Sequence, residues 1–278
     1  MLATASNTAA ERYARGWAKL REVDGEAGEQ VIDSLRDVSP DLSRYLIEYC
    51  FGDIYSRGKL DLKTTELVVV TALAAMGTAE PQLRVHLHGA LNTGNSRQEV
   101  VEALLQVAVF AGFPAALKSI VAAREVFAAR DEQGKLDAPL APTAAAPTGA
   151  RPVRGEAALE HLKEGQLRHL HAEYDAIAPD VVGFIVDFCF GDVLSRPALP
   201  PPLRQLLTVG MVTAKGGMTA ELEFHTRAAL HLGCSPEAIL EIMLLLTVYA
   251  GFPAALNGIA IAKKVLAEPT AGPSDSNP

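Results

Sequence analysis

The sequence contains two copies of one unit, and this duplication constrains the fold more than any other feature. The segment at 50–53 (CFGD) recurs at 189–192, and the segment at 112–117 (GFPAAL) recurs at 251–256. Both pairs are 139 residues apart, and the same offset, held without a gap from 40 to 128, gives 33 identities in 89 positions. Because this period far exceeds the roughly 20–50 residues of solenoid repeats, each half is a whole domain.

The 278-residue chain therefore divides into two domains of ordinary size. We expect repeat 1 to comprise residues 1–133 and repeat 2 to comprise residues 153–268. Residues 134–152 are rich in proline and alanine, which favours a semi-rigid linker. Residues 269–278 are expected to form a loose C-terminal tail.

The hydrophobic pattern within each repeat is helical. Residues 100–109 place their apolar side chains along one stripe of a 3.6-residue helix. Ser96 and Glu99 form a capping box ahead of this stripe. The aligned position in repeat 2 has Ser235 as N-cap and Pro236 as first helical residue. Two different start signals at one aligned position therefore predict the same helix boundary.

One β-branched segment, 68–71 (VVVT), could suggest a strand. It lies within 62–76, a stretch without glycine or proline that is long for a strand and ordinary for a helix. We therefore expect an all-α fold of two tandem helical domains, with six or seven helices in each.

Charge and hydropathy exclude several classes of partner. The formal net charge is −8, and no basic run is longer than Lys263-Lys264, which argues against a nucleic-acid or anionic-membrane partner. The richest apolar stretch, 242–256, is too short and too interrupted to span a bilayer. Residues 1–7 lack the features of a secretory signal. We therefore expect a cytoplasmic location.

Five segments carry a resemblance to a known family. In repeat 1 they are 63–67 (KTTEL), 83–94 (LRVHLHGALNTG) and 110–117 (FAGFPAAL). In repeat 2 they are 222–233 (LEFHTRAALHLG) and 249–256 (YAGFPAAL). In this combination the chain resembles the carboxymuconolactone decarboxylase family.

The resemblance covers roughly residues 40–130 and 179–268, and it implies an all-helical fold of the type shared with alkylhydroperoxidase D. Single-domain members are similar to one repeat and assemble into hexamers. The resemblance therefore implies a pseudo-dimer within each chain and a homotrimer that forms a pseudo-hexamer.

The family includes two chemistries that the sequence distinguishes. The alkylhydroperoxidase D branch reduces disulfides through a C-x-x-C just before the family histidine, but 79–82 (AEPQ) and 218–221 (MTAE) contain no cysteine. Thiol redox chemistry needs a thiolate and a resolving partner. The resemblance then implies the decarboxylase branch: a cofactor-independent lyase, similar to 4-carboxymuconolactone decarboxylase, acting on a small carboxylated lactone or related enolisable, aromatic-derived compound.

Loss of CO2 from such a substrate requires an acid that protonates the resulting dienolate carbon. His86 is the main candidate, because an imidazole near its ordinary pKa can donate or accept a proton at neutral pH. It recurs as His225. Glu66 matches the family's glutamate, and we expect it to orient or polarise His86. The alternative for both histidines is hydrogen bonding in the core or at an interface.

The substrate must also be held in a dry pocket. Arg84 is a candidate for binding its carboxylate, although it lies about 200° around a helix from the histidine and would have to reach the substrate from a neighbouring element. A solvated surface position is the alternative. Phe113 and Phe252 each follow the glycine of a GFPAAL segment, and the family resemblance implies that they line the pocket.

The two repeats differ at the positions that matter for this chemistry. Gln205 replaces Glu66, and Glu223 replaces Arg84. If repeat 1 alone carries the working site, repeat 2 supplies a wall of the shared pocket and stabilises the ring. The alternative, equally open from the sequence, is that both sites use another proton-transfer or carbon–carbon lyase reaction, since fold does not fix function.

Other recurring residues have structural explanations. Asp53 and Arg57 stand four apart, as do their counterparts in repeat 2, and are expected to form helix-stabilising pairs. Cys50 and its counterpart are expected to pack in the core. For Glu102 and its counterpart Glu241, structural pairing and a functional role both stay open.

Three cysteines with no C-x-x-C predict no disulfide framework and no zinc site, and we expect no metal and no cofactor. The expected partners are a small-molecule substrate and further copies of the chain. Two other functions compete with the lyase. One is a non-catalytic, oligomeric small-molecule-binding protein. The less favoured one is a thiol-dependent peroxidase, for which Cys234, present in repeat 2 alone, offers no paired thiol.

Overall fold

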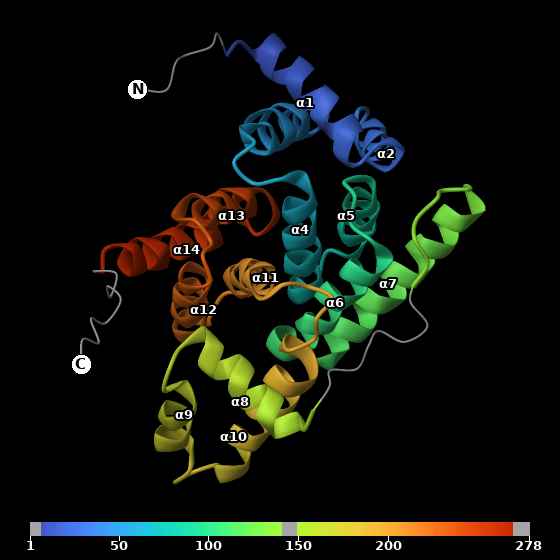
Figure 1. The fold of residues 1–278 in the computed structure, drawn as a ribbon. Helices are drawn as coiled ribbons and strands as arrows, with labels where there is room; N and C mark the ends of the chain where they lie inside the picture. Colours follow the sequence, from blue (N-terminus) through green and yellow to red (C-terminus); the bar gives the residue numbers. More distant parts are fainter. Residues whose placement is uncertain (1–6, 141–148, 269–278) are drawn as a thin grey trace.

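A computed structural model describes residues 7–140 and 149–268 (Figure 1). Over these two ranges the chain forms helices joined by turns, which confirms the all-α prediction. No helix in the described ranges is both long and apolar enough to cross a membrane. The middle of the expected linker and the expected tail lie outside the described residues.

Between residues 7 and 133, repeat 1 contains seven α-helices and two short segments of other helix types. They are α1 (Ala9–Val23), α2 (Glu26–Leu35), α3 (Pro40–Tyr45), the π-helix η1 (Leu46–Ile54), the 3-10 turn η2 (Tyr55–Arg57), α4 (Leu62–Met76), α5 (Glu80–Asn92), α6 (Arg97–Ala111) and α7 (Phe113–Glu132).

Repeat 2 follows the same order, with its first helix beginning at Arg151. Its elements are α8 (Arg151–Leu162), α9 (Gln166–Tyr174), α10 (Pro179–Phe184), the π-helix η3 (Ile185–Leu194), α11 (Pro201–Lys215), α12 (Thr219–His231), α13 (Pro236–Tyr249) and α14 (Gly251–Leu266).

The helix-start signals act as expected. The Ser96 side chain accepts a hydrogen bond from the backbone of Glu99, whose own side chain bonds back to the cap. Ser235 caps α13 by accepting a hydrogen bond from the backbone of Ala238, with Pro236 as the first helical residue. Gly112, at φ 85°, ends α6 in a backbone conformation that favours glycine. Both repeats therefore place the same helix at the same aligned position.

The recurring CFGD segment lies in the two π-helices, where its glycine lets another helix approach. A Cβ atom at Gly52 would lie 2.6 Å from the carbonyl oxygen of Arg12 in α1. In the opposite direction, Gly16 of α1 faces the carbonyl of Ile47 too closely for any side chain. Gly155 and its π-helix repeat this contact in repeat 2. The 139-residue offset therefore extends to the first helix of each repeat.

The expected helix pair between Asp53 and Arg57 is wrong. Asp53 instead accepts hydrogen bonds from Arg12, including one of 2.9 Å from Nε, because α1 covers that face of η1. Arg57 reaches across to repeat 2 and pairs with Glu241 at 2.8 Å. The counterpart contact joins Arg196 to Glu102 of repeat 1. The recurring arginine and glutamate thus connect the two repeats.

The two repeats meet at the centre of the molecule, where α4 packs against α11 (Figure 1). Both helices are buried almost throughout, and their buried residues are mainly apolar. Gly210 permits the contact, since a Cβ atom there would lie 2.8 Å from the side chain of Val68. One apolar core therefore runs through both repeats.

Repeat 2 also has a smaller core of its own beneath α8 and η3. In repeat 1, α2 packs against α5 and buries Ile32 in the main core. The position that corresponds to Ile32 in repeat 2 is His171, which is exposed. Without this apolar anchor, α9 packs mainly against α8 and α10, at the bottom of the view in Figure 1.

Candidate active sites in two unequal repeats

His86 of α5 and Glu66 of α4 form the centre of a buried polar cluster in repeat 1. The imidazole Nδ1 lies 3.0 Å from Oε2 of Glu66, which has no exposed surface. The two residues are 20 positions apart, and the packing of α4 against α5 brings them together. This contact matches the expected orientation of His86 by Glu66. Among the described residues, Nε2 of His86 makes no hydrogen bond.

A second carboxylate, Asp24, completes the cluster. It caps the C-terminus of α1, and its Oδ1 lies 3.7 Å from Nδ1 of His86. This oxygen is buried and has no hydrogen-bond partner among the described residues. Asp24 is not among the site residues predicted from the sequence, because an aspartate before a glycine at a helix end is typical of a turn. The signal that could have found it is its replacement by Lys163 in repeat 2.

Gly89 makes room for both carboxylates. A Cβ atom at this position would come within 2.9 Å of Asp24 Oδ1 and still closer to Glu66 Oε2. Real Cβ atoms do not approach oxygen that closely, so any larger residue would displace the acids. In repeat 2 the corresponding residue is Ala228, which is buried. The difference at this position is therefore a sequence signal for the acidic cluster.

Two tyrosines connect Glu66 to repeat 2. Tyr55 donates a 2.6 Å hydrogen bond to Oε1 of Glu66, and its hydroxyl lies 2.7 Å from that of Tyr249. Tyr249 belongs to α13, and its ring meets His86 edge-on with centroids 4.9 Å apart. Burial raises the pKa of both hydroxyls well above the ordinary value, so they remain donors. Repeat 2 thus contributes a side chain to the site of repeat 1.

The cluster keeps His86 protonated at neutral pH. Burial alone would lower its pKa, but the charges of Glu66 and Asp24 outweigh burial and raise the pKa to about 9. Burial raises the pKa of Asp24 to about 7, and the charge of His86 makes this rise smaller than burial alone would. The structure therefore presents an imidazolium held between two acids, with a proton available at Nε2.

His225 of repeat 2 lies in the opposite environment. Its Nδ1 is 2.7 Å from Oε1 of Gln205, an uncharged partner. The rings of Phe110 and Phe224 meet it edge-on at 5.2 and 5.0 Å. Burial lowers the pKa of His225 to about 3. This histidine is therefore neutral, and its contact with the Gln205 oxygen places the proton on Nδ1.

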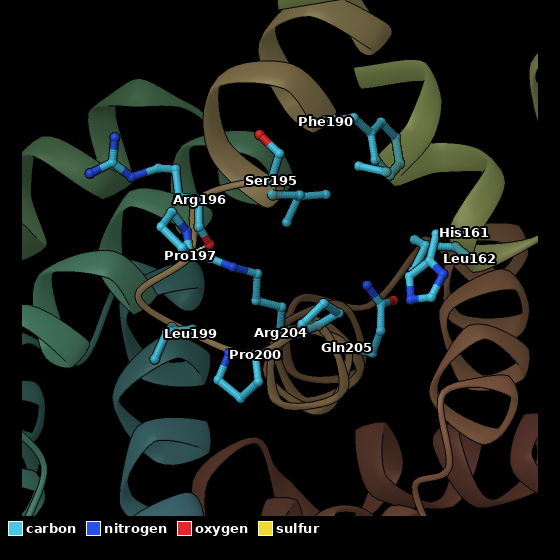
Figure 2. A pocket seen from close by; sticks show the side chains of 13 residues that line it. His161, Leu162, Phe190, Ser195, Arg196, Pro197, Leu199, Pro200, Arg204 and Gln205 are labelled. Atoms are coloured by element: carbon cyan, nitrogen blue, oxygen red, sulfur yellow. Dashed lines mark hydrogen bonds between the residues drawn. The ribbon is translucent and has the colours of Figure 1, made fainter. Parts of the chain in front are cut away.

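A cavity of about 600 Å3 opens beside His225. Side chains of α8, α9, η3 and α12 line it, together with Phe110 from the end of α6. A second cavity, of about 170 Å3, adjoins it and shares Phe190 and Leu194 (Figure 2). Figure 2 shows Gln205 at the edge of this second cavity, from where it also bonds to His225. Lys163 and Leu194 line the larger cavity, and their counterparts in repeat 1 are Asp24 and Tyr55. Both of these side chains are buried near His86.

Both repeats match one family model, described as the carboxymuconolactone decarboxylase family, over residues 40–125 and 179–264. These two matches span more than half of the chain. The chain belongs to this family. The identified regions contain His86 with Glu66 and His225 with Gln205, whereas Asp24 lies before the first of them.

Several relatives of the family are similar to parts of this chain. A 4-carboxymuconolactone decarboxylase of Acinetobacter baylyi is 32% identical over 118 residues, which cover 42% of this chain and 87% of that protein. A nitrosuccinic acid decarboxylase of Metarhizium robertsii is 32% identical over 82 residues, covering 30% of this chain and 57% of that protein.

A solved structure covers both repeats together. It is a candidate gamma-carboxymuconolactone decarboxylase subunit from Burkholderia xenovorans, with a TM-score of 0.55 and 22% identity over 91% of this chain and 97% of that one. At this identity the likeness shows the fold alone. It agrees with a tandem arrangement of two family domains.

The structure does not place Arg84, the residue expected to bind the substrate's carboxylate, next to the family histidine. The guanidinium of Arg84 pairs with Glu80 at 2.9 Å and with Glu125 at 2.5 Å, on the half-exposed outer side of α5 and α7. Its side chain is 35% exposed, and no contact links it to His86. A role for Arg84 in substrate binding is therefore a prediction that no contact in the described chain supports.

The two phenylalanines expected to line the pocket lie on the surface. Phe113 is 59% exposed and contacts Phe188, and Phe252 is 56% exposed and stacks on Tyr49. Each ring is thus next to the opposite repeat rather than to a family histidine. The open question about Glu102 has a structural answer: it is fully buried and pairs with Arg196 and Arg204.

Three residues could bind a cation if one entered the acidic cluster. Asp24, Glu66 and His86 each present a ligand atom, and these atoms lie within 4.8 Å of one another. The Glu66 oxygen and the His86 nitrogen already engage each other. The absence of a metal from the reaction stays a prediction, and chelation tests it.

Proposed function

We propose that the chain is a decarboxylase-type lyase that uses the imidazolium of His86 as its general acid. The observation that carries this proposal is the pairing of a buried histidine with Glu66, which fixes the Nδ1 proton and leaves Nε2 for the substrate. The names of the relatives from Acinetobacter baylyi and Metarhizium robertsii support loss of CO2 as the reaction type. A small carboxylated lactone is the proposed substrate class.

The proposed reaction needs no external electron acceptor. The bond between the ring carbon and the carboxylate breaks, CO2 leaves, and the electron pair enters the conjugated carbonyl to give a dienolate. Nε2–H of His86 then protonates the dienolate carbon, and the lactone double bond forms. The histidine regains its proton from solvent. Glu66 stabilises the imidazolium before the transfer, and the hydrogen bond from Tyr55 holds Glu66 in place.

Exposed apolar residues support the proposed trimer. Four pairs of them stand at corresponding positions of the two repeats, as expected if pseudo-equivalent surfaces meet in a ring. They are Val38 and Ile177, Tyr45 and Phe184, Phe113 and Phe252, and Leu117 and Leu256. Light scattering on the purified chain should give three times 29.5 kDa, and a strictly monomeric protein at micromolar concentration would refute the trimer.

The test of the reaction uses the purified full chain and 4-carboxymuconolactone. We expect a change in ultraviolet absorbance and release of one CO2 per lactone, both unaffected by a chelator. Binding without CO2 release would instead support the non-catalytic binding protein. Loss of activity with a chelator, restored by one divalent metal, would place a cation in the acidic cluster.

Thiol alkylation distinguishes the peroxidase alternative. Burial raises the pKa of all three thiols, Cys50, Cys189 and Cys234, which opposes the thiolate that peroxidase chemistry needs. We therefore expect CO2 release to survive alkylation of the accessible cysteines.

A further inference from the structure

We propose that the cavity of repeat 2 is a binding site for a neutral, ring-containing molecule with a hydroxyl group, and that it rejects carboxylates. This site is separate from the proposed reaction at His86. It follows from the shape of the cavity, the unpaired acceptor of His225 and the charges around it.

The cavity has the size and walls of a small-molecule site. Its volume of about 600 Å3 lies within the roughly 300–1,000 Å3 typical of such sites. Phe110, Phe190 and Phe224 line it together with Ile185 and Leu170. Aromatic walls favour a flat ring, which they can contact face-on or edge-on.

One hydrogen-bond acceptor of the family histidine is directed to this cavity without a donor. His225 is neutral and carries its proton on Nδ1 toward Gln205, so Nε2 presents a lone pair. Among the described residues, no side chain donates a hydrogen bond to this nitrogen. Polar atoms inside a protein are nearly always hydrogen-bonded. A hydroxyl on the ligand would donate to Nε2 of His225.

The charges around the cavity disfavour an anion. The cation of Arg227 is already paired with Glu223 and with Glu268. Glu173, Glu221 and Glu223 line the cavity, and Lys163, which also lines it, is exposed to solvent. A carboxylate entering toward His225 would face the lone pair of Nε2 and no unpaired buried cation among the described residues, and burial of such an unpaired charge is costly.

The first experiment compares three ligands that share one ring system. Isothermal titration of the purified full chain with 2-naphthol at pH 7 should show one molecule bound per chain. 2-Methoxynaphthalene, which lacks the donor, should bind roughly 5- to 100-fold more weakly, because a buried acceptor then stays unpaired. 2-Naphthoate should bind at least as poorly. Equal binding of all three, or preferred binding of 2-naphthoate, would overturn the proposal.

The second experiment locates the bound ligand. Cys189 lines the cavity and Cys234 does not, so 2-naphthol should slow the reaction of N-ethylmaleimide with Cys189 while leaving Cys234 unchanged. Mass spectrometry of the labelled chain measures both rates. Binding without protection of Cys189 would place the ligand elsewhere and overturn the assignment.

A matched pair of variants tests the acceptor. His225→Phe keeps a ring but removes Nε2, and it should weaken 2-naphthol binding roughly 5- to 100-fold. His171→Phe changes an exposed histidine of α9 outside the cavity and should leave binding unchanged. If His225→Phe does not fold, His225→Ala removes the same nitrogen with a smaller side chain. Full affinity in the folded acceptor variant would overturn the proposed contact.

Discussion

Repeat 1 and repeat 2 hold the same histidine on the same helix and give it opposite properties. His86 lies between two carboxylates, with a pKa of about 9. His225 lies among phenylalanines beside an amide, with a pKa of about 3. The difference teaches that a recurring residue defines a position, whereas its neighbours define the chemistry available there.

Three replacements produce this contrast. Asp24, Glu66 and Gly89 of repeat 1 become lysine, glutamine and alanine in repeat 2. The first two remove both negative charges, and the third places a methyl group where the carboxylate oxygens would lie. The three changes act on one site from three different helices, so they are consistent with loss of the acidic cluster as a unit.

Packing changes together with charge. Ile32 ties α2 to the core of repeat 1, and the exposed His171 gives α9 no such attachment. Repeat 2 therefore has space beside its histidine where repeat 1 has side chains. The repeat with the reactive cluster is closed, and the repeat with the neutral histidine is open.

The largest expected effect separates the two histidines by activity. His86→Ala should reduce the rate of CO2 release about 100- to 10,000-fold, because it removes the general acid. His225→Ala should have a far smaller effect, because that imidazole is neutral and has no acidic partner. Steady-state kinetics on 4-carboxymuconolactone checks this, with circular dichroism as the control for folding. Equal, large losses in both variants would mean two working sites.

Local sequence signals predicted the helices, and the family motifs predicted that Glu66 and His86 form a pair at the site. Ser96, Glu99 and Pro236 specify helix starts through hydrogen bonds and dihedral angles within a few residues, so their effect can be read from the chain itself. Glu66 and His86 come together because two consecutive helices pack against each other, and the family resemblance implied their cooperation.

The remainder of the site depends on contacts that no local pattern encodes. Tyr249 reaches His86 across the boundary between repeats, and Asp24 does so from a helix outside the matched regions. The expected pairing of Asp53 with Arg57 failed for the same reason, since both side chains found partners on other helices. Sequence spacing defines which residues share a helix face, but not which helix covers that face.

The next largest effect is on stability, and it distinguishes the two ion pairs between the repeats. Glu102→Ala should lower the free energy of unfolding by about 3–5 kcal/mol, because it leaves the fully buried Arg204 without its acid. Glu241→Ala should cost about 0.2–1 kcal/mol, because Arg57 is 40% exposed and can be hydrated. Urea denaturation of both variants measures the difference. Similar losses would show that the two pairs are energetically equivalent despite their burial.

A third comparison exchanges the residue that makes room for the acids. Gly89→Ala should lower stability by roughly 1–3 kcal/mol through overpacking, and should lower the pKa of His86 by pushing the carboxylates away. Ala228→Gly should cost about 0.5–1 kcal/mol, the ordinary penalty of glycine in a helix. Thermal unfolding gives the stabilities, and NMR titration gives the pKa. An unchanged His86 pKa in Gly89→Ala would contradict the proposed role of this glycine.

The fourth comparison uses pH. The raised pKa of His86 gives stability that is present below the unfolded value of 6.5 and is lost as pH rises through about 9. The lowered pKa of His225 has the opposite sign: the unfolded chain binds the extra proton, so stability falls as pH drops below 6.5 toward about 3. His225→Gln should therefore gain Tm relative to the parent on acidification.

The matched variant is His86→Gln, which should lose most stability relative to the parent below pH 6.5 and recover toward pH 10. Each kcal/mol corresponds to about 2–4 °C in Tm for a large domain. Differential scanning calorimetry between pH 4 and pH 10 measures both profiles. Parallel profiles for the two variants would mean that the histidines titrate alike in the folded chain.

The smallest effect tests the side chain that repeat 2 contributes to repeat 1. Tyr249→Phe keeps the ring against His86 but removes the hydroxyl that bonds to Tyr55, which should cost roughly 0.5–1.5 kcal/mol of stability. The pKa of His86 should change little, because Tyr55 still donates to Glu66.

Phe110 is the counterpart of Tyr249 on the other side, and Phe110→Leu removes a ring beside His225 without removing a hydrogen bond. If the hydrogen bond between the hydroxyls of Tyr249 and Tyr55 contributes to the reaction, Tyr249→Phe should lower the rate of CO2 release. Phe110→Leu should leave that rate unchanged. Equal rates in both variants and the parent would limit the contribution of repeat 2 to packing.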